Sequence, residues 1–254
     1  MTSLSPNAEA RSRLCLALDT GDLGEAVRLA KSVEPHFGWV KVGLELFTAH
    51  GPRAIESVRG LGLDVFLDLK LHDIPNTVAS AAREISNLGA SMLNVHCLGG
   101  EEMIRWAVDA VRETSAGFRR SPPKVVGVTL LTSLDQQFVA SVLGYPGTID
   151  QLVISLGSLA RTAGADGVVA SALELRALKR EFGASFVVVT PGVTLDDGAA
   201  PADQRRTTTV SHAIADGADL VVIGRAVSRS SDPQDAAGRA HDAAASEISR
   251  LRST

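Results

Sequence analysis

Four segments between residues 88 and 224 share one pattern, in which Gly-Ala and then Ser or Asp lead into a short apolar run. The segments are LGASMLNVH (88–96), AGADGVVAS (163–171), FGASFVVVT (182–190) and DGADLVVIG (216–224). A glycine just past a helix supplies a left-handed C-cap, and the run that follows is typical of a strand buried on both faces. Four junctions of one design therefore predict repeated strand–helix units.

Four further segments are predicted to be strands, which brings the expected number of strands to eight. By length and apolar content they are RLCLALD (13–19), WVKVG (39–43) and LDVFLDLK (63–70), with KVVGVTLL (124–131) following later. Helical patterns separate the strands, the first capped by Asp22 and the others near 52–60, 76–88, 100–115, 149–163, 172–182, 203–216 and 234–251.

Eight strands that alternate with eight helices, without a linker between them, favour an α/β fold of one domain. We predict a single (β/α)8 TIM barrel over residues 1–254, with residues 1–11 as a polar N-terminal extension. An open doubly wound sheet is the alternative. The longest loops, 132–147 and 191–202, would lie at the C-terminal face of the barrel, where active sites of this fold are built.

Composition narrows the class of protein. Hydrophobic residues make up 45% of the 254 residues and charged residues 21%, and the net charge of −4 gives no reason to expect nucleic acid or an anionic membrane as a partner. Cys15 and Cys97 have neither metal-ligand spacing nor a disulfide framework. The N-terminus lacks the apolar core of a secretory signal, and no segment has 18 consecutive apolar residues. We therefore expect a cytoplasmic protein.

Charged residues gather at the ends of the first three strands. Alternate residues of a strand face opposite sides, so Asp68 and Lys70 share one face of the third strand with Asp64 and Phe66. Val65, Leu67, Leu69 and Leu71 take the opposite face. By the same parity Asp19 and Lys41 project from the first and second strands. An isolated Asp-x-Lys is usually a structural ion pair. Four charges of alternating sign at one end of a barrel favour a functional site instead.

The types of these residues indicate acid–base chemistry. Lys70 is a candidate proton donor or Schiff-base nucleophile, because a partly buried lysine is easily retuned by its neighbours. The carboxylates of Asp68 and Asp73 would keep it protonated, which favours proton donation. His72 and His96 stand apart from any cluster of metal-ligating residues, so we predict no metal.

The last two units contain candidate phosphate-binding residues. Thr190-Pro191-Gly192 ends the seventh strand, and Gly224-Arg225 follows the eighth. Barrels often bind phosphate at these two loops through backbone N–H groups, a helix N-terminus and a cationic side chain.

Several of these motifs together resemble one known family. The segment DLKLHDIPNTV (68–78) resembles the signature of orotidine 5′-phosphate decarboxylases, and the likeness extends over nearly the whole chain. The other matching segments are LALD (16–19), KVGLELF (41–47), NVHCLGG (94–100), LLTS (130–133), TPGV (190–193), DQRR (203–206) and VVIGRAVSRSSDP (221–233). The Asp-x-Lys-x-x-Asp motif alone is shared with related barrels, so it is the full ordered set that is specific.

The resemblance implies a decarboxylation without a cofactor, acting on orotidine 5′-monophosphate. Asp68 would face the substrate carboxylate and Lys70 would protonate C6. Lys41 and Asp73 would complete a row of alternating charges with them. The protein would be a homodimer in which Asp73 and Thr77 reach the neighbouring site. The substrate-binding residues that the resemblance implies are Asp19 and Lys41 for the ribose, Thr132 and Ser133 for the pyrimidine, and Gln204, Gly224 and Arg225 for the phosphate, with Asp68, Thr77 and Pro191 beside them.

One departure from the family pattern concerns the phosphate. Many bacterial members carry an arginine where this chain has Thr194, so Arg225 and backbone groups are the firmer phosphate ligands. Two alternatives remain. A hexulose-phosphate synthase or keto-gulonate-phosphate decarboxylase shares the barrel and uses a metal, but has a glutamate where this chain has Lys41. A non-catalytic nucleotide-binding barrel would lack Lys70 or Asp68.

Overall fold

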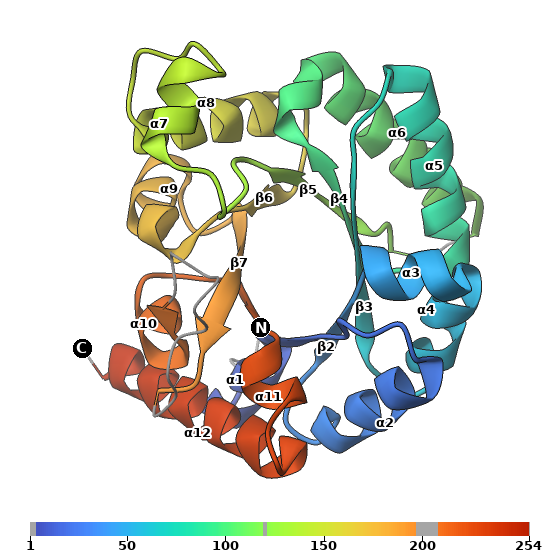
Figure 1. The fold of residues 1–254 in the computed structure, drawn as a ribbon, viewed down its shortest axis with the longest axis vertical. Helices are drawn as coiled ribbons and strands as arrows, with labels where there is room; N and C mark the ends of the chain where they lie inside the picture. The colour runs from blue at the N-terminus through green and yellow to red at the C-terminus, as the bar shows by residue number, and fades with distance from the viewer. Residues whose placement is uncertain (1–3, 119–120, 197–207, 254) are drawn as a thin grey trace.

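Parallel strands form a closed ring with helices around it (Figure 1). The computed structural model describes residues 4–118, 121–196 and 208–253. Eight strands close the barrel in the order β1-β2-β3-β4-β5-β6-β7-β9, with β9 pairing back onto β1, and every pairing is parallel. A short strand, β8, adds to the edge of β7. The predicted TIM barrel is confirmed, and the open sheet is not what the chain forms.

The elements follow one another in the alternation expected of this fold. The strands are β1 (Leu14–Ala17), β2 (Trp39–Gly43), β3 (Asp64–Leu71), β4 (Met92–His96), β5 (Lys124–Val128), β6 (Gly167–Val169), β7 (Val187–Thr194), β8 (Thr208–Thr209) and β9 (Leu220–Ile223). The α-helices are α1 (Pro6–Ser12), α2 (Leu23–Val33), α3 (Leu44–His50), α4 (Pro52–Arg59), α5 (Pro75–Leu88), α6 (Gly100–Phe118), α7 (Gln136–Ser141), α8 (Ile149–Thr162), α9 (Leu175–Phe182), α10 (Val210–Ala215), α11 (Arg225–Ser228) and α12 (Pro233–Arg252), with 3₁₀ turns η1 (Cys97–Gly99) and η2 (Ala172–Glu174).

Local sequence signals account for where the helices begin and end. Asp22 caps α2 by accepting a hydrogen bond from the Glu25 N–H, and Thr148 with Gln151 forms a capping box on α8. Each such cap stabilises its helix by about 1 kcal/mol. The glycines of the four repeated junctions all have positive φ: Gly89 at 80°, Gly164 at 85°, Gly183 at 78° and Gly217 at 98°. Gly89 is the left-handed cap that the pattern predicts, whereas Gly183, with a ψ of −179°, is not in the left-handed helical region.

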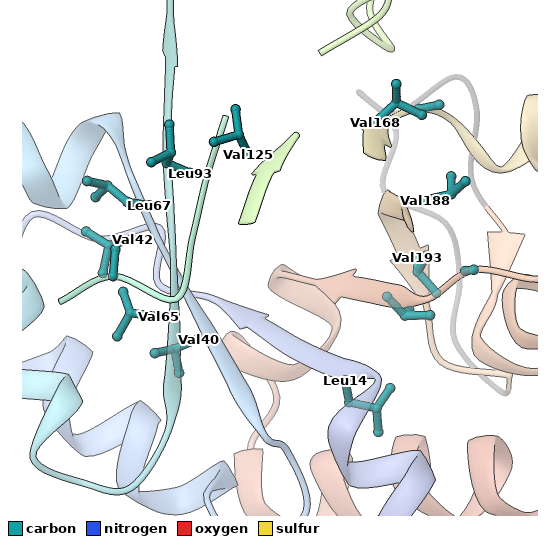
Figure 2. Close-up of a cluster of buried hydrophobic side chains, with 14 of the residues drawn as sticks. Leu14, Val40, Val42, Val65, Leu67, Leu93, Val125, Val168, Val188 and Val193 are labelled. Carbon is teal, nitrogen blue, oxygen red and sulfur yellow. The ribbon is translucent and has the colours of Figure 1, made fainter. Parts of the chain in front are cut away.

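Two hydrophobic layers lie on the two faces of the barrel wall. The outer layer packs strands against helices and includes Val40, Val42, Val65 and Leu67 (Figure 2). The inner layer fills the barrel and consists of Cys15, Ala17, Phe66, Met92, Val126, Val189, Leu220 and Val222. Because Phe66 is inside while Val65 and Leu67 are outside, Asp68 also faces the interior, as the parity of the strand predicts.

The structure contains elements that the sequence patterns did not indicate. Helix α3 follows β2 without a connecting loop, and α7 lies inside the loop predicted over 132–147. Within the predicted N-terminal extension, Pro6–Ser12 forms α1, which packs on α12 and is tied to it by an ion pair between Glu9 and Arg252. Among the described residues, no helix is long and apolar enough to cross a membrane.

Candidate active site

The charged residues predicted at the ends of β1, β2 and β3 come together. Lys70 Nζ lies 2.6 Å from Asp68 Oδ1, and Lys41 Nζ lies 3.4 Å from Asp68 Oδ2. Lys41 also donates a hydrogen bond of 2.9 Å to Asp19 Oδ1. The four side chains therefore form a continuous row of alternating charge, Asp19–Lys41–Asp68–Lys70. We refer to this row as the charge array.

Mutual attraction keeps the central members of the array ionised. Burial by itself lowers the pKa of Lys41, but Asp68 and then Asp19 outweigh burial, so its pKa lies above the ordinary value. Burial likewise opposes ionisation of Asp68. Lys41, Lys70 and hydrogen bonds from Lys70 and Asn94 nevertheless hold the pKa of Asp68 below its usual range. The site thus keeps a fixed negative charge between two fixed positive charges.

An irregularity in β3 sets the position of Lys70. Between the pairs Leu67–Leu93 and Leu71–Val95, β3 advances by four residues and β4 by two. Within this bulge Lys70 has a φ of 51°, in the left-handed region that side-chain-bearing residues rarely adopt. The alternation of the strand therefore stops at Lys70, and its ammonium meets Asp68 through a bulge rather than through regular pleating.

A residue that the sequence interpretation did not select connects these parts. Asn94, on β4, is buried and accepts a hydrogen bond of 2.8 Å from the Lys70 backbone N–H through Oδ1. Its Nδ2 donates a bond of 2.7 Å to Asp68 Oδ1. A polar residue inside the apolar run MLNVH was the available signal, because a buried amide needs partners.

The array forms one side of a cavity at the C-terminal end of the barrel. Lys41, Asp68 and Lys70 line it, together with Thr132 and Pro191. The remaining lining residues are apolar: Phe66, Val128, Leu130, Leu131, Val169, Ala170, Val189 and Val222. A flat, largely apolar ring with a charged substituent would find both an apolar surface and charged partners here.

Other predicted site residues neither line the cavity nor join the array. Asp73 is exposed, and its carboxylate accepts a hydrogen bond from the Ile74 N–H rather than contacting Lys70. Thr77, in the first turn of α5, is also exposed, as is Ser133. Among the described residues of the single chain, therefore, the array has four members and Asp73 is not one of them.

The predicted phosphate-binding residues lie at the ends of β7 and β9. Gly224 precedes the short helix α11, whose first residue is Arg225, and both residues are partly exposed. Thr194 ends β7 and is buried, and its hydroxyl finds no hydrogen-bond partner among the residues that the structure describes. Gln204 lies outside the described residues.

The two histidines near the site contact each other. The rings of His72 and His96 stack with centroids 5.2 Å apart. Burial, and then the neighbouring His72 and Lys70, lowers the pKa of His96, so that this ring stays neutral. Among the described residues, no three His, Cys, Asp or Glu side chains are grouped so that they could hold a metal ion.

A closed parallel barrel with an ionised Asp/Lys array in a cavity at the carboxyl ends of its strands is the construction of a TIM-barrel enzyme. Comparison with known proteins identifies which kind. Residues 12–240 match the model of the orotidine 5′-phosphate decarboxylase / HUMPS family. The chain belongs to this family.

Individual relatives agree over most of the chain. The chain is 46% identical to the orotidine 5′-phosphate decarboxylase of Moorella thermoacetica, with 90% of each chain covered. It is 45% identical to that of Paramagnetospirillum magneticum, covering 88% of this chain and 94% of the relative. The crystal structure of the Lactobacillus acidophilus orotidine 5′-phosphate decarboxylase superposes with a TM-score of 0.79 at 34% identity, covering 91% of this chain and 98% of the other.

Proposed function

We propose that this protein is an orotidine 5′-phosphate decarboxylase, a carboxy-lyase that converts orotidine 5′-monophosphate to UMP and CO2 in pyrimidine biosynthesis. The observation that carries the proposal is the position of Lys41, held between Asp19 and Asp68. The metal-dependent barrels with the same Asp-x-Lys-x-x-Asp core have a glutamate there. An ammonium group at this point would repel a divalent cation, and it suits chemistry carried out by fixed side-chain charges.

Lys70 is the proton donor in this proposal. As the bond between C6 and the carboxylate breaks, CO2 leaves and the electron pair remains on C6. The Lys70 ammonium transfers a proton to that carbon, which gives UMP, and the neutral amine then takes a proton from solvent. The adjacent Asp68 holds the Lys70 side chain in position until the transfer, because the two groups are in hydrogen-bond contact.

Asp68 also acts on the leaving group. Its low pKa keeps it ionised, so a substrate carboxylate placed beside it meets a like charge. This repulsion disappears when the carboxylate becomes neutral CO2. Binding of the remote phosphate by Arg225 and backbone groups near Gly224 supplies the free energy that holds the substrate there. The pyrimidine lies against the apolar side of the cavity beside Thr132 and Pro191, and Asp19 with Lys41 holds the ribose hydroxyls.

The active form in this proposal is a homodimer. Asp73 and Thr77 are exposed and make no contact with the array of their own subunit that the structure records, so they are available to a second copy. Between them Ile74 exposes 67% of its surface, and Leu98, in the turn after the neighbouring strand, exposes 45%. Exposed apolar side chains beside an active site mark an interaction surface. In the dimer, Asp73 and Thr77 complete the partner's site.

A cytoplasmic location is also part of this proposal, and the state of the two cysteines supports it. Cys15 and Cys97 are both free and buried, which fits a reducing compartment.

Loss of the substrate's ultraviolet absorbance tests the function. Purified protein is mixed with orotidine 5′-monophosphate in EDTA, and in a parallel sample with Mg²⁺ in place of EDTA. We expect equal turnover in both samples, because no step uses a metal. Turnover only with Mg²⁺, or none in either sample, would contradict the proposal, and the first result would favour a metal-dependent enediolate enzyme.

A further inference from the structure

The backbone of Lys70 adopts a conformation that needs external support. Among the described residues it is the one non-glycine residue with a positive φ, at 51°. This region is unfavourable for a side chain with a Cβ, and such residues persist only where surrounding contacts hold them. The support for Lys70 must therefore come from a neighbour that binds its main chain.

Asn94 is that neighbour. It lies on β4 opposite the bulge, is 1% exposed, and its Oδ1 accepts the Lys70 backbone N–H at 2.8 Å. Its Nδ2 donates to Asp68 Oδ1 at 2.7 Å, and the same carboxylate oxygen accepts from Lys70 Nζ at 2.6 Å. One amide therefore bridges the main chain of Lys70 and the carboxylate that its ammonium contacts.

The chemistry of the two partners fixes the side chain that can occupy this place. A backbone N–H can only donate, and an ionised carboxylate can only accept. The bridging group must then carry an acceptor on one side and a donor on the other. The distance from the acceptor to the Lys70 nitrogen is 2.8 Å, and the distance from the donor to the Asp68 oxygen is 2.7 Å. A neutral primary amide does this. A carboxylate at 94 would repel Asp68, and an apolar residue would leave the Lys70 N–H unpaired in the interior.

We propose that Asn94 is a positioning residue for the decarboxylation step, which locks Lys70 in its left-handed conformation and thereby fixes the Lys70 ammonium against Asp68. This inference deepens the proposed function and rests on it. Asn94 is not among the described residues that line the cavity. Its removal should therefore lower kcat and leave KM nearly unchanged, because proton transfer depends on sub-ångström placement while binding uses other groups.

Two variants separate positioning from a merely structural role. In Asn94→Leu both hydrogen bonds are lost at similar volume, and we expect kcat to fall about 100-fold with KM within about threefold of wild type. In Asn94→Asp the ionised form repels Asp68. The protonated form restores a carbonyl acceptor for the Lys70 N–H and an O–H donor for Asp68. The kcat of Asn94→Asp relative to wild type should therefore rise as pH falls.

Met92→Leu is the matched control. Met92 lies two residues earlier on the same inward face of β4 and is equally buried, but it belongs to the apolar interior below the array. We expect this variant to keep wild-type kcat. UMP binding, measured by calorimetry, should be the same in all three variants.

Hydrogen exchange provides a readout that does not depend on activity. Mass spectrometry of peptides that cover residues 66–72, or NMR of labelled lysine, reports protection of the Lys70 N–H. We expect Asn94→Leu to lose this protection and Met92→Leu to keep it. If wild type shows no turnover, the proposed function fails, and exchange still decides the role of Asn94. Any of three results would overturn the inference. They are unchanged protection of the Lys70 N–H in Asn94→Leu, a kcat of Asn94→Leu within threefold of that of Met92→Leu, and a ratio of the Asn94→Asp kcat to the wild-type kcat that does not change with pH.

Discussion

Gly43 lies so close to Lys41 that a Cβ atom on the glycine would come within 2.9 Å of the lysine Nζ. The same Cβ would lie 3.5 Å from Asp19 Oδ1. A lysine ammonium can usually move aside, but this one is held by Asp19 and Asp68 on two sides. The absence of a side chain at the end of β2 is therefore part of how the charge array is built.

Replacing this glycine should disturb the array without disturbing the fold. Gly43 has a φ of −97°, which any residue can adopt, so Gly43→Ala adds only a close contact with Lys41 and an ordinary one with Asp19. We expect kcat/KM for orotidine 5′-monophosphate to fall roughly 10- to 100-fold, with the far-ultraviolet circular dichroism unchanged. Gly60→Ala is the control, since a Cβ there meets nothing within 4 Å. Equal activity of the two variants would show that Lys41 tolerates displacement.

The ionisation of Asp68 should appear in the pH dependence of stability. Its folded-state pKa lies below the ordinary value of 3.8, so its contribution is fully present above that pH and is lost as pH falls through the folded pKa. Lys41 has the opposite shift, and its contribution is lost above its ordinary value of 10.5.

Urea denaturation of wild type and Asp68→Asn measures this contribution. The difference between their free energies of unfolding should stay constant from roughly pH 5 to 9. As pH drops below about 4, wild type should lose stability relative to Asp68→Asn. If wild type instead gains stability relative to Asp68→Asn on acidification, Asp68 is protonated more easily in the folded protein than in the unfolded chain.

Strand parity predicted most of the array because a closed barrel enforces it. Cys15, Ala17 and Phe66 fill the interior as expected, and Asp19 and Asp68, which follow them in the same parity, both contact Lys41. Parity has no information about a bulge, so it gave the contact between Asp68 and Lys70 without the left-handed backbone that makes it.

Other features were missed for physical reasons that can be named. Asn94 sits within an apolar run, and only the three-dimensional pairing of β4 with β3 shows what its amide binds. Helix α3 begins directly after Gly43, and no turn signal separates it from the strand. The family resemblance implies that Asp73 serves the neighbouring subunit's site, and in the single chain its carboxylate accepts a hydrogen bond from the Ile74 N–H, which leaves that role a prediction. A partner subunit is needed to test its role.

Mixing two inactive variants tests whether Asp73 acts across the dimer. In a mixed dimer of Lys70→Ala and Asp73→Asn chains, one site would receive both defects and the other neither. Random pairing makes half of the dimers mixed, so we expect about a quarter of wild-type activity per site after the chains are unfolded and refolded together. Each variant refolded alone is the control.

Absence of recovery in the mixture, with sedimentation showing that mixed dimers form, would mean that Asp73 serves its own subunit. Sedimentation of wild type at low concentration checks the dimer itself, and a monomer with full activity would contradict the shared site.

The role of Lys70 as proton donor is tested most directly by turnover of orotidine 5′-monophosphate in EDTA by wild type and Lys70→Ala. Because a positioned general acid contributes about 10²- to 10⁴-fold in rate, and Lys70 also balances Asp68, we predict that Lys70→Ala loses at least this factor and has no measurable turnover under conditions where wild type is active. Its circular dichroism and UMP binding should remain those of wild type. A Lys70→Ala protein that keeps most of the wild-type rate would show that the proton comes from another group and would contradict the mechanism.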